Sequence, residues 1–332
     1  MSISILLDCL EKDSVTGTES FSSFSIFLKK TIESFGGKYI SNHNGDIIGF
    51  FGDLDSKDTY VLESHIDEVG FFINSIKNGE IYVGCIGKYN FGYLDGIEGA
   101  DVFKTEGDNK YYGIINYIGN GCFKLSSDYK DKFNVGDILS FKRSIINGKE
   151  YTIAPSLDNK VGCALNLSVA KHIKDFFIKQ GKKLAVVFSS GEEIRQNSSA
   201  YFLSQQNLNI KKVYIIDAAY AEPIVTDGLH MNIPTSGFGP AIQHIGESFV
   251  IPKIQIDYIK DIANKNNIPL QDEIAILELG RTNQLFFYRY GWDVAVINIP
   301  VAFQHTIKSK LKNIDYINGI KLMLKVLEND IS

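Results

Sequence analysis

The sequence VFSSGEE, residues 187–193, is the segment around which the rest of the chain is organised. Its apolar, β-branched beginning is typical of a buried strand, and the small residues that follow open the carboxyl end of that strand toward a site. Successive side chains on an extended backbone point in opposite directions, so Glu192 and Glu193 are expected to do different work. One carboxylate could bind a metal ion, and the other could act on a water molecule. Taken alone, such a pair more often marks the solvated start of a helix.

The composition is that of an ordinary globular protein long enough for two domains. The chain has 332 residues, of which 44% are hydrophobic and 22% charged, and this length permits a large core. A net charge of −5 without any basic run argues against a nucleic-acid partner. No apolar run approaches the roughly 20 residues of a membrane-spanning helix, and the acidic start of the chain is not that of a signal peptide. Four scattered cysteines indicate reduced thiols in a cytoplasmic protein.

Strands alternate with helices over most of the chain. The expected strands cover residues 47–51, 59–64, 183–188, 212–216, 273–278 and 293–300. The expected helices cover residues 161–176, 197–206, 252–267 and 312–328, and residues 1–36 also have a helical pattern. This alternation predicts an α/β fold: a three-layer α/β/α catalytic domain with a mostly parallel sheet, formed by residues 1–70 and 152–332.

Residues 71–151 have a different pattern. Turn signals such as Asn78-Gly79 and Asn147-Gly148 are closely spaced, and short alternating segments lie between them. Such hairpins without a helical period predict a small all-β domain, a barrel or a PDZ-like fold, inserted into the larger domain.

Histidines and carboxylates follow the strand ends, where ligands bind in parallel α/β sheets. Each has an ordinary explanation on its own, because His65 and Asp67 could lie on a surface loop and Asp158 could cap a helix. Together the candidates comprise two histidines and three carboxylates, which is the set that a pair of zinc-like ions needs when one carboxylate bridges them. The candidate ligands are His65, Asp158, Glu193, Asp217 and His305.

The order of these motifs resembles that of a known family. The chain has His-x-Asp at residues 65–67, Asp-Asn-Lys-Val-Gly at 158–162, the glutamate pair, Asp217 and His305, with a β domain between the first two motifs. It is similar to the co-catalytic metallo-aminopeptidases of the glutamyl and tetrahedral (TET) aminopeptidase family, some of which are labelled endoglucanases. The resemblance runs over essentially the whole chain.

The resemblance implies a role for each candidate residue. Asp158 would bridge two divalent ions, and the peptide bond between Asp158 and Asn159 would be cis. His65 and Asp217 would complete one metal site, and Glu193 and His305 the other. The metal expected is zinc, with cobalt or manganese as alternatives, because mixed nitrogen and oxygen ligands accept all three.

The implied reaction is hydrolysis of the N-terminal residue of a small peptide. Glu192 would be the general base for a metal-bridging water, and Asp67 would support His65 or its metal. The β domain would determine how copies of the chain assemble, and it would prevent folded proteins from reaching the active site. A homo-oligomer is expected, built from dimers and reaching a dodecamer by analogy.

Several flanking residues depart from the family pattern. Asn159 and Lys160 replace an aspartate and an arginine, Asn283 replaces an aspartate, and residues 302–304 replace Arg-Tyr-Ile. The segment after Glu193 departs as well. Because all five ligands and the base are present, catalysis is the expectation. Two alternatives are a related dinuclear-metal hydrolase of N-acyl substrates and a catalytically inactive, metal-stabilised assembly protein.

Overall fold

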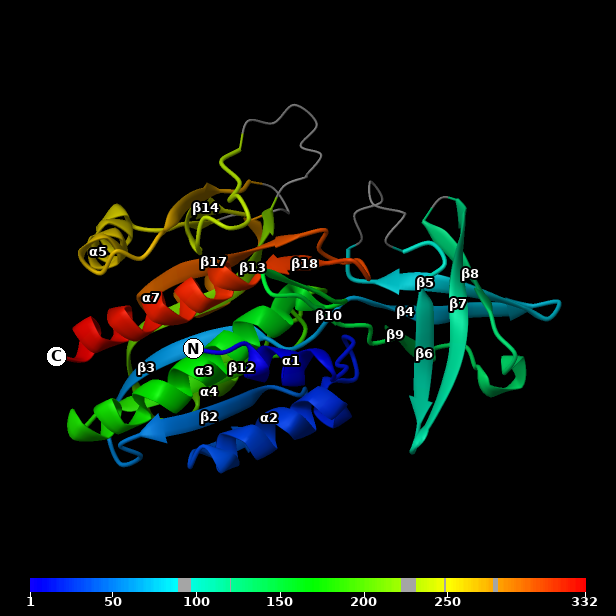
Figure 1. The fold of residues 1–332 in the computed structure, drawn as a ribbon. Helices are drawn as coiled ribbons and strands as arrows, with labels where there is room; N and C mark the ends of the chain where they lie inside the picture. Colours follow the sequence, from blue (N-terminus) through cyan, green and yellow to red (C-terminus); the bar gives the residue numbers. More distant parts are fainter. Residues whose placement is uncertain (89–96, 120, 222–230, 248, 277–279) are drawn as a thin grey trace.

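The computed structural model describes residues 1–332 except 89–96, 120, 222–230, 248 and 277–279. It has a large α/β body with a 12-stranded sheet, from one side of which a closed β-barrel projects (Figure 1). This confirms the predicted fold class, an α/β domain with an inserted all-β module.

The large sheet is parallel at its centre, and most of the strand pairs at its margins are antiparallel. The central strands, in spatial order, are β12 (Lys183–Ser189), β3 (Asp58–His65), β13 (Asn209–Ala221) and β17 (Val294–Ala302). Their carboxyl ends meet at one edge of the sheet because they run in one direction. The remaining strands are β1 (Lys38–Ser41), β2 (Ile47–Gly52), β10 (Ile146–Asn147), β11 (Tyr151–Ile153), β14 (Ala241–Gly246), β15 (Phe249–Val250), β16 (Gln271–Ile274) and β18 (Lys310–Lys312). Residues 277 and 278 of the strand expected at 273–278 lie outside the described part of the chain.

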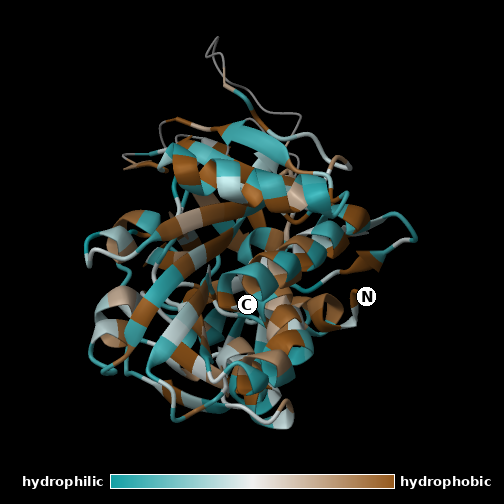
Figure 2. Ribbon diagram, turned by 90° about the vertical axis from the view of Figure 1, so that its left-hand side faces the viewer, coloured by the Kyte–Doolittle hydropathy of each residue, from teal (hydrophilic) through white to brown (hydrophobic). Residues whose placement is uncertain are grey.

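Amphipathic helices pack on this sheet. The longest, α3 (Leu157–Lys179), contacts the central strands and lies beside α1 (Ser4–Leu10) and α7 (Asn313–Ile331). Hydrophobic and hydrophilic residues are interspersed along the helices around the sheet (Figure 2). The other helices are α1 (Ser4–Leu10), η1 (Glu19–Phe21), α2 (Ser23–Ser34), η3 (Lys130–Lys132), α4 (Ser199–Ser204), α5 (Lys253–Lys265), α6 (Gln284–Tyr288) and α7 (Asn313–Ile331). Among the described residues, no helix is both long and apolar enough to cross a membrane.

The N-terminal region differs from the single helical segment expected over residues 1–36. It forms two helices, α1 and α2, joined by a loop and the short η1. The Ser22 side chain accepts a hydrogen bond from the backbone N–H of Ser25 and so caps α2. The loop between the helices reaches the segment that follows β3, where Val15 forms an isolated β-bridge with Glu68. This tertiary pairing explains why helical periodicity is interrupted there.

The barrel has its own hydrophobic core. Its strands are β4 (Gly70–Lys77), β5 (Glu80–Ile86), β6 (Asp101–Glu106), β7 (Asn109–Gly119), β8 (Cys122–Ser126) and β9 (Ile138–Phe141). The Phe71 ring packs edge-on against those of Phe123 and Phe141, with centroids 5.6 and 5.4 Å apart. After β9 the chain returns to the large sheet through β10, which begins before the boundary expected at residue 151, and β11, which begins at that residue.

Candidate metal centre

His65 lies at the carboxyl end of β3, directly beside the end of β12. The two strands are parallel, with His65 opposite Ser189, and the N–H of Ile66 donates to the Ser189 carbonyl at 2.7 Å. This register brings the histidine next to the turn that carries the glutamate pair. Gly191, with φ of +73°, makes that turn in the left-handed conformation that glycine adopts readily.

Asp158 spans the two histidines of the site. Its Oδ1 lies 3.1 Å from Nε2 of His65, and its Oδ2 lies 3.3 Å from Nε2 of His305. The Asp158–Asn159 peptide bond is cis, which confirms the expectation drawn from the family resemblance. A carboxylate that directs one oxygen to each of two histidines has the arrangement a bridging ligand needs.

Each histidine also faces one further carboxylate. Asp217 Oδ1 lies 3.3 Å from Nε2 of His65, and Glu193 Oε1 lies 3.5 Å from Nε2 of His305. The structure therefore brings all five predicted ligands together. Asp217 lies within β13 rather than at its end, because β13 continues beside β17 as far as Ala221.

The cluster fits bound cations chemically. One ligand atom from each of His65, Asp158 and Glu193 lies within 4.8 Å of the other two. Burial, with neighbouring acids, raises the pKa of Glu193 to about 8 and that of Asp217 to about 7. Buried Glu193 Oε1 accepts no hydrogen bond from any described residue. Crowded carboxylates with such an orphaned oxygen, beside imidazole nitrogens, form a donor set that divalent metals accept.

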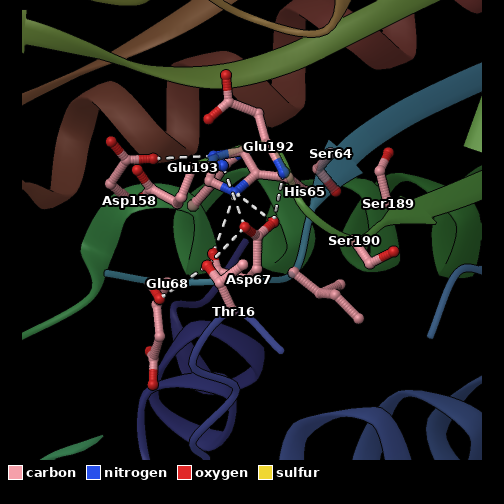
Figure 3. A network of polar contacts seen from close by, with 12 residues as sticks. Thr16, Ser64, His65, Asp67, Glu68, Asp158, Ser189, Ser190, Glu192 and Glu193 are labelled. Atoms are coloured by element: carbon pink, nitrogen blue, oxygen red, sulfur yellow. Dashed lines mark hydrogen bonds and ion pairs between the residues drawn. The ribbon is translucent and has the colours of Figure 1, made fainter. Parts of the chain in front are cut away.

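Asp67 connects the histidine to the glutamate turn (Figure 3). Its backbone carbonyl lies 3.1 Å from Nδ1 of His65, so the opposite ring nitrogen faces the cluster. Its carboxylate accepts the backbone N–H of Glu192 at 3.0 Å and that of Glu193 at 3.1 Å. The Thr16 hydroxyl donates to the same carboxylate at 2.9 Å. Asp67 thus contacts His65 through its backbone carbonyl and the glutamate turn through its carboxylate, and so links the ends of β3 and β12.

Thr16 and Arg281 are site residues to which the sequence alone assigns no role. Arg281 Nε donates to Glu192 Oε1 at 3.2 Å, and its Nη2 donates to the Glu192 carbonyl at 3.4 Å. No local signal could reveal these contacts, because they join residues that are 51 and 89 positions apart.

Two of the residues that depart from the family pattern follow Asp158 directly and contact residues outside the ligand cluster. Asn159 donates to the Ile216 carbonyl at 2.9 Å and accepts the N–H of Gly162 at 2.9 Å. Lys160 is buried, with its ammonium 3.6 Å from the centre of the Phe24 ring. Both replacements are therefore accommodated by contacts within the protein.

Asn283 and Gln304, which also depart from the pattern, lie close to the same centre. The Asn283 amide donates to Glu63 Oε1 at 2.8 Å. Gln304 lines the same cavity as Glu192 and His305. Asn283 is thus held by a buried acid, whereas Gln304 faces the space that a substrate would enter.

Comparisons with known proteins agree with this geometry. A family model for M42 glutamyl aminopeptidases matches residues 123–322. A protein of Acetivibrio thermocellus named "Putative aminopeptidase" is 26% identical over 273 residues, covering 80% of this chain and 78% of that protein. A TET aminopeptidase from the marine sediment archaeon Thaumarchaeota archaeon SCGC AB-539-E09 has the same fold, with a TM-score of 0.84, 17% identity and 99% and 98% of the two chains covered. The Pyrococcus horikoshii TET1 peptidase, which can assemble into a tetrahedron or a large octahedral shell, has a TM-score of 0.80, 18% identity and 98% of each chain covered.

The family match identifies a hydrolase of peptide bonds, and the cluster of histidines and carboxylates is its candidate metal site. The match to the family model covers more than half of the sequence. The chain therefore belongs to the M42 glutamyl aminopeptidase family, whose members are metal-dependent aminopeptidases.

Proposed function

We propose that this protein is a dinuclear-metal aminopeptidase that removes N-terminal residues from small peptides. The observation that carries the proposal is the position of Asp158, whose two oxygens face different histidines. One ion would be held by His65 and Asp217. The other would be held by Glu193 and His305, and Asp158 would contact both ions. Zinc is the metal we expect, with cobalt and manganese as alternatives for the same donor set.

The cations, when bound, would polarise the scissile carbonyl and lower the pKa of the attacking water. Glu192 takes a proton from that water and returns it to the leaving amine. Arg281, which donates to its carboxylate, and Asp67, which accepts its backbone N–H, help to hold Glu192 in position. The N–H of Glu193 donates to the same Asp67 carboxylate, but the Glu193 side chain faces His305. The adjacent glutamates therefore have different roles, Glu192 as the base and Glu193 as a metal ligand.

We assign residues 71–151 to assembly and to restricting access. The barrel extends away from the α/β body (Figure 1), and the Pyrococcus horikoshii TET1 peptidase, which has a similar fold, can assemble into a tetrahedron or a large octahedral shell. A homo-oligomer built from dimers, up to a dodecamer, would admit small peptides and exclude folded proteins. Four free cysteines fit a cytoplasmic location.

Hydrolysis of paired substrates tests the reaction. Metal-reconstituted protein should cleave aminoacyl anilides and leave their N-acetylated counterparts intact, because an aminopeptidase recognises the free α-amine. The opposite preference would indicate a hydrolase of N-acyl substrates. Chelated protein is the control and should cleave neither.

A further inference from the structure

The active-site cavity has a cation beside the proposed general base. Arg281 lines this cavity together with Glu192 and Tyr220, and its side chain is 20% exposed. We propose that Arg281 binds the C-terminal carboxylate of a dipeptide substrate, so that dipeptides are the preferred peptides. This inference rests on the proposed function, because it takes Glu192 as the group that protonates the leaving amine.

Distance along the substrate supports this assignment. Proton transfer requires the leaving nitrogen to lie within hydrogen-bond reach of the Glu192 carboxylate. Arg281 Nε lies 3.2 Å from Oε1 of that carboxylate. In a dipeptide a single Cα separates the leaving nitrogen from the terminal carboxylate carbon, a span of about 2.5 Å. A substrate that places its nitrogen on Glu192 therefore places its carboxylate within reach of the guanidinium.

Arg281 retains hydrogen-bonding capacity for this contact. A guanidinium carries five N–H donors, and Glu192 occupies only one from Nε and one from Nη2. Nη1 has no partner among the residues that the structure describes. The remaining donors form the planar fork that matches a carboxylate. In a partly buried cavity such a pair is screened less than on an open surface.

Longer peptides and amides lack the matching charge. Where a dipeptide has its carboxylate, a tripeptide or a dipeptide amide has a neutral carbonyl, which can accept a hydrogen bond but forms no ion pair. Charge-assisted hydrogen bonds are about twice as strong as neutral ones. We therefore expect kcat/KM for a free dipeptide to exceed that for its amide by roughly ten-fold or more.

The test compares three kinds of substrate for the parent and three variants. Xaa-Gly dipeptides, their Xaa-Gly amides and aminoacyl anilides are assayed with several N-terminal residues, using zinc-loaded protein. Arg281→Gln removes the charge, and Arg281→Lys keeps it without the fork. Arg195→Gln is the matched control. The Arg195 side chain is 52% exposed, pairs with Glu247 at 3.1 Å and does not line the cavity.

The informative quantity is the ratio of kcat/KM between the free dipeptide and its amide. Arg281→Gln should bring this ratio close to one, whereas Arg281→Lys should keep part of it and Arg195→Gln all of it. If Arg281 only orients Glu192, Arg281→Gln will lower kcat for all three substrates equally and leave the ratio unchanged, which overturns the inference. A parent ratio near one also overturns it. Failure to cleave even the anilides contradicts the proposed function itself, and with it this assignment.

Discussion

Asp67 shows how one residue can organise a site without contacting the chemistry. Both of its oxygens accept backbone N–H groups, one from Glu192 and one from Glu193, while its carbonyl faces His65. A side chain behind a metal ligand sets the orientation of that ligand and its affinity for the ion. We therefore expect Asp67 to position both the proposed base, Glu192, and the proposed metal ligands His65 and Glu193.

Asp67→Asn is predicted to weaken metal binding by roughly ten- to hundred-fold. The amide keeps the volume of the side chain but replaces one acceptor with a donor, so it cannot accept both N–H groups of the glutamate turn. Competition with a chromophoric zinc chelator measures the change. Thr16→Val, which removes only one hydrogen bond to the same carboxylate, is the control and should have a smaller effect. Equal zinc affinity in Asp67→Asn and the parent would refute this role.

At the scale of elements, an ion-pair network joins the N-terminal loop, the end of the barrel and α3. Glu68 pairs with Arg143, which follows β9, and lies 3.6 Å from Nζ of Lys160 on α3. Burial opposes ionisation of Glu68, but these two cations outweigh it and lower the pKa of its carboxyl from 4.5 to about 2. Glu68 also accepts the N–H of Ser14 at 3.0 Å.

Acid should weaken this junction in a defined pH range. Because the folded pKa of Glu68 is lowered, its contribution to the free energy of unfolding is complete above about pH 4.5 and disappears as pH falls toward 2. The lowered pKa corresponds to about 3 kcal/mol. Urea unfolding of chelated parent and Glu68→Gln should therefore give a stability difference that shrinks between these pH values. A difference that stays constant with pH would contradict the assignment.

The sequence was most informative where an apolar run ends. His65 and the glutamate pair lie at the ends of buried strands, so strand periodicity and parallel topology were enough to predict that they meet. The same reasoning identified Asp217, although β13 runs further than its apolar core. Thr16 and Arg281 were missed because Thr16 falls in a stretch expected to be helical and Arg281 falls in a loop, and only the packing of distant segments places them at the site.

At the scale of the whole molecule, the candidate metal centre lies where several elements converge. Its five proposed ligands come from the end of β3, the interior of β13, the segment after β17, the turn after β12 and the start of α3. Bound ions would therefore join elements that are distant in sequence. Binding to the folded state alone adds stability that grows with metal concentration.

Removal of metal should lower the melting temperature by several degrees. Free zinc at about 100 times its dissociation constant should restore about 2.7 kcal/mol of stability. Thermal unfolding of chelated protein across a zinc titration measures this, and His65→Ala should respond much less. A melting temperature that is independent of metal in the parent would show that the cluster does not bind ions in the folded protein.

The most direct test of the dinuclear mechanism is to measure metal content and aminoacyl-anilide hydrolysis together for the parent and Glu192→Gln. We predict two ions per chain in both proteins, and a kcat lower by about a hundred-fold or more in the variant, because the amide cannot accept the proton from water. Full activity in the metal-loaded variant would contradict the role of Glu192, and one ion per chain in the parent would contradict the bridging role of Asp158.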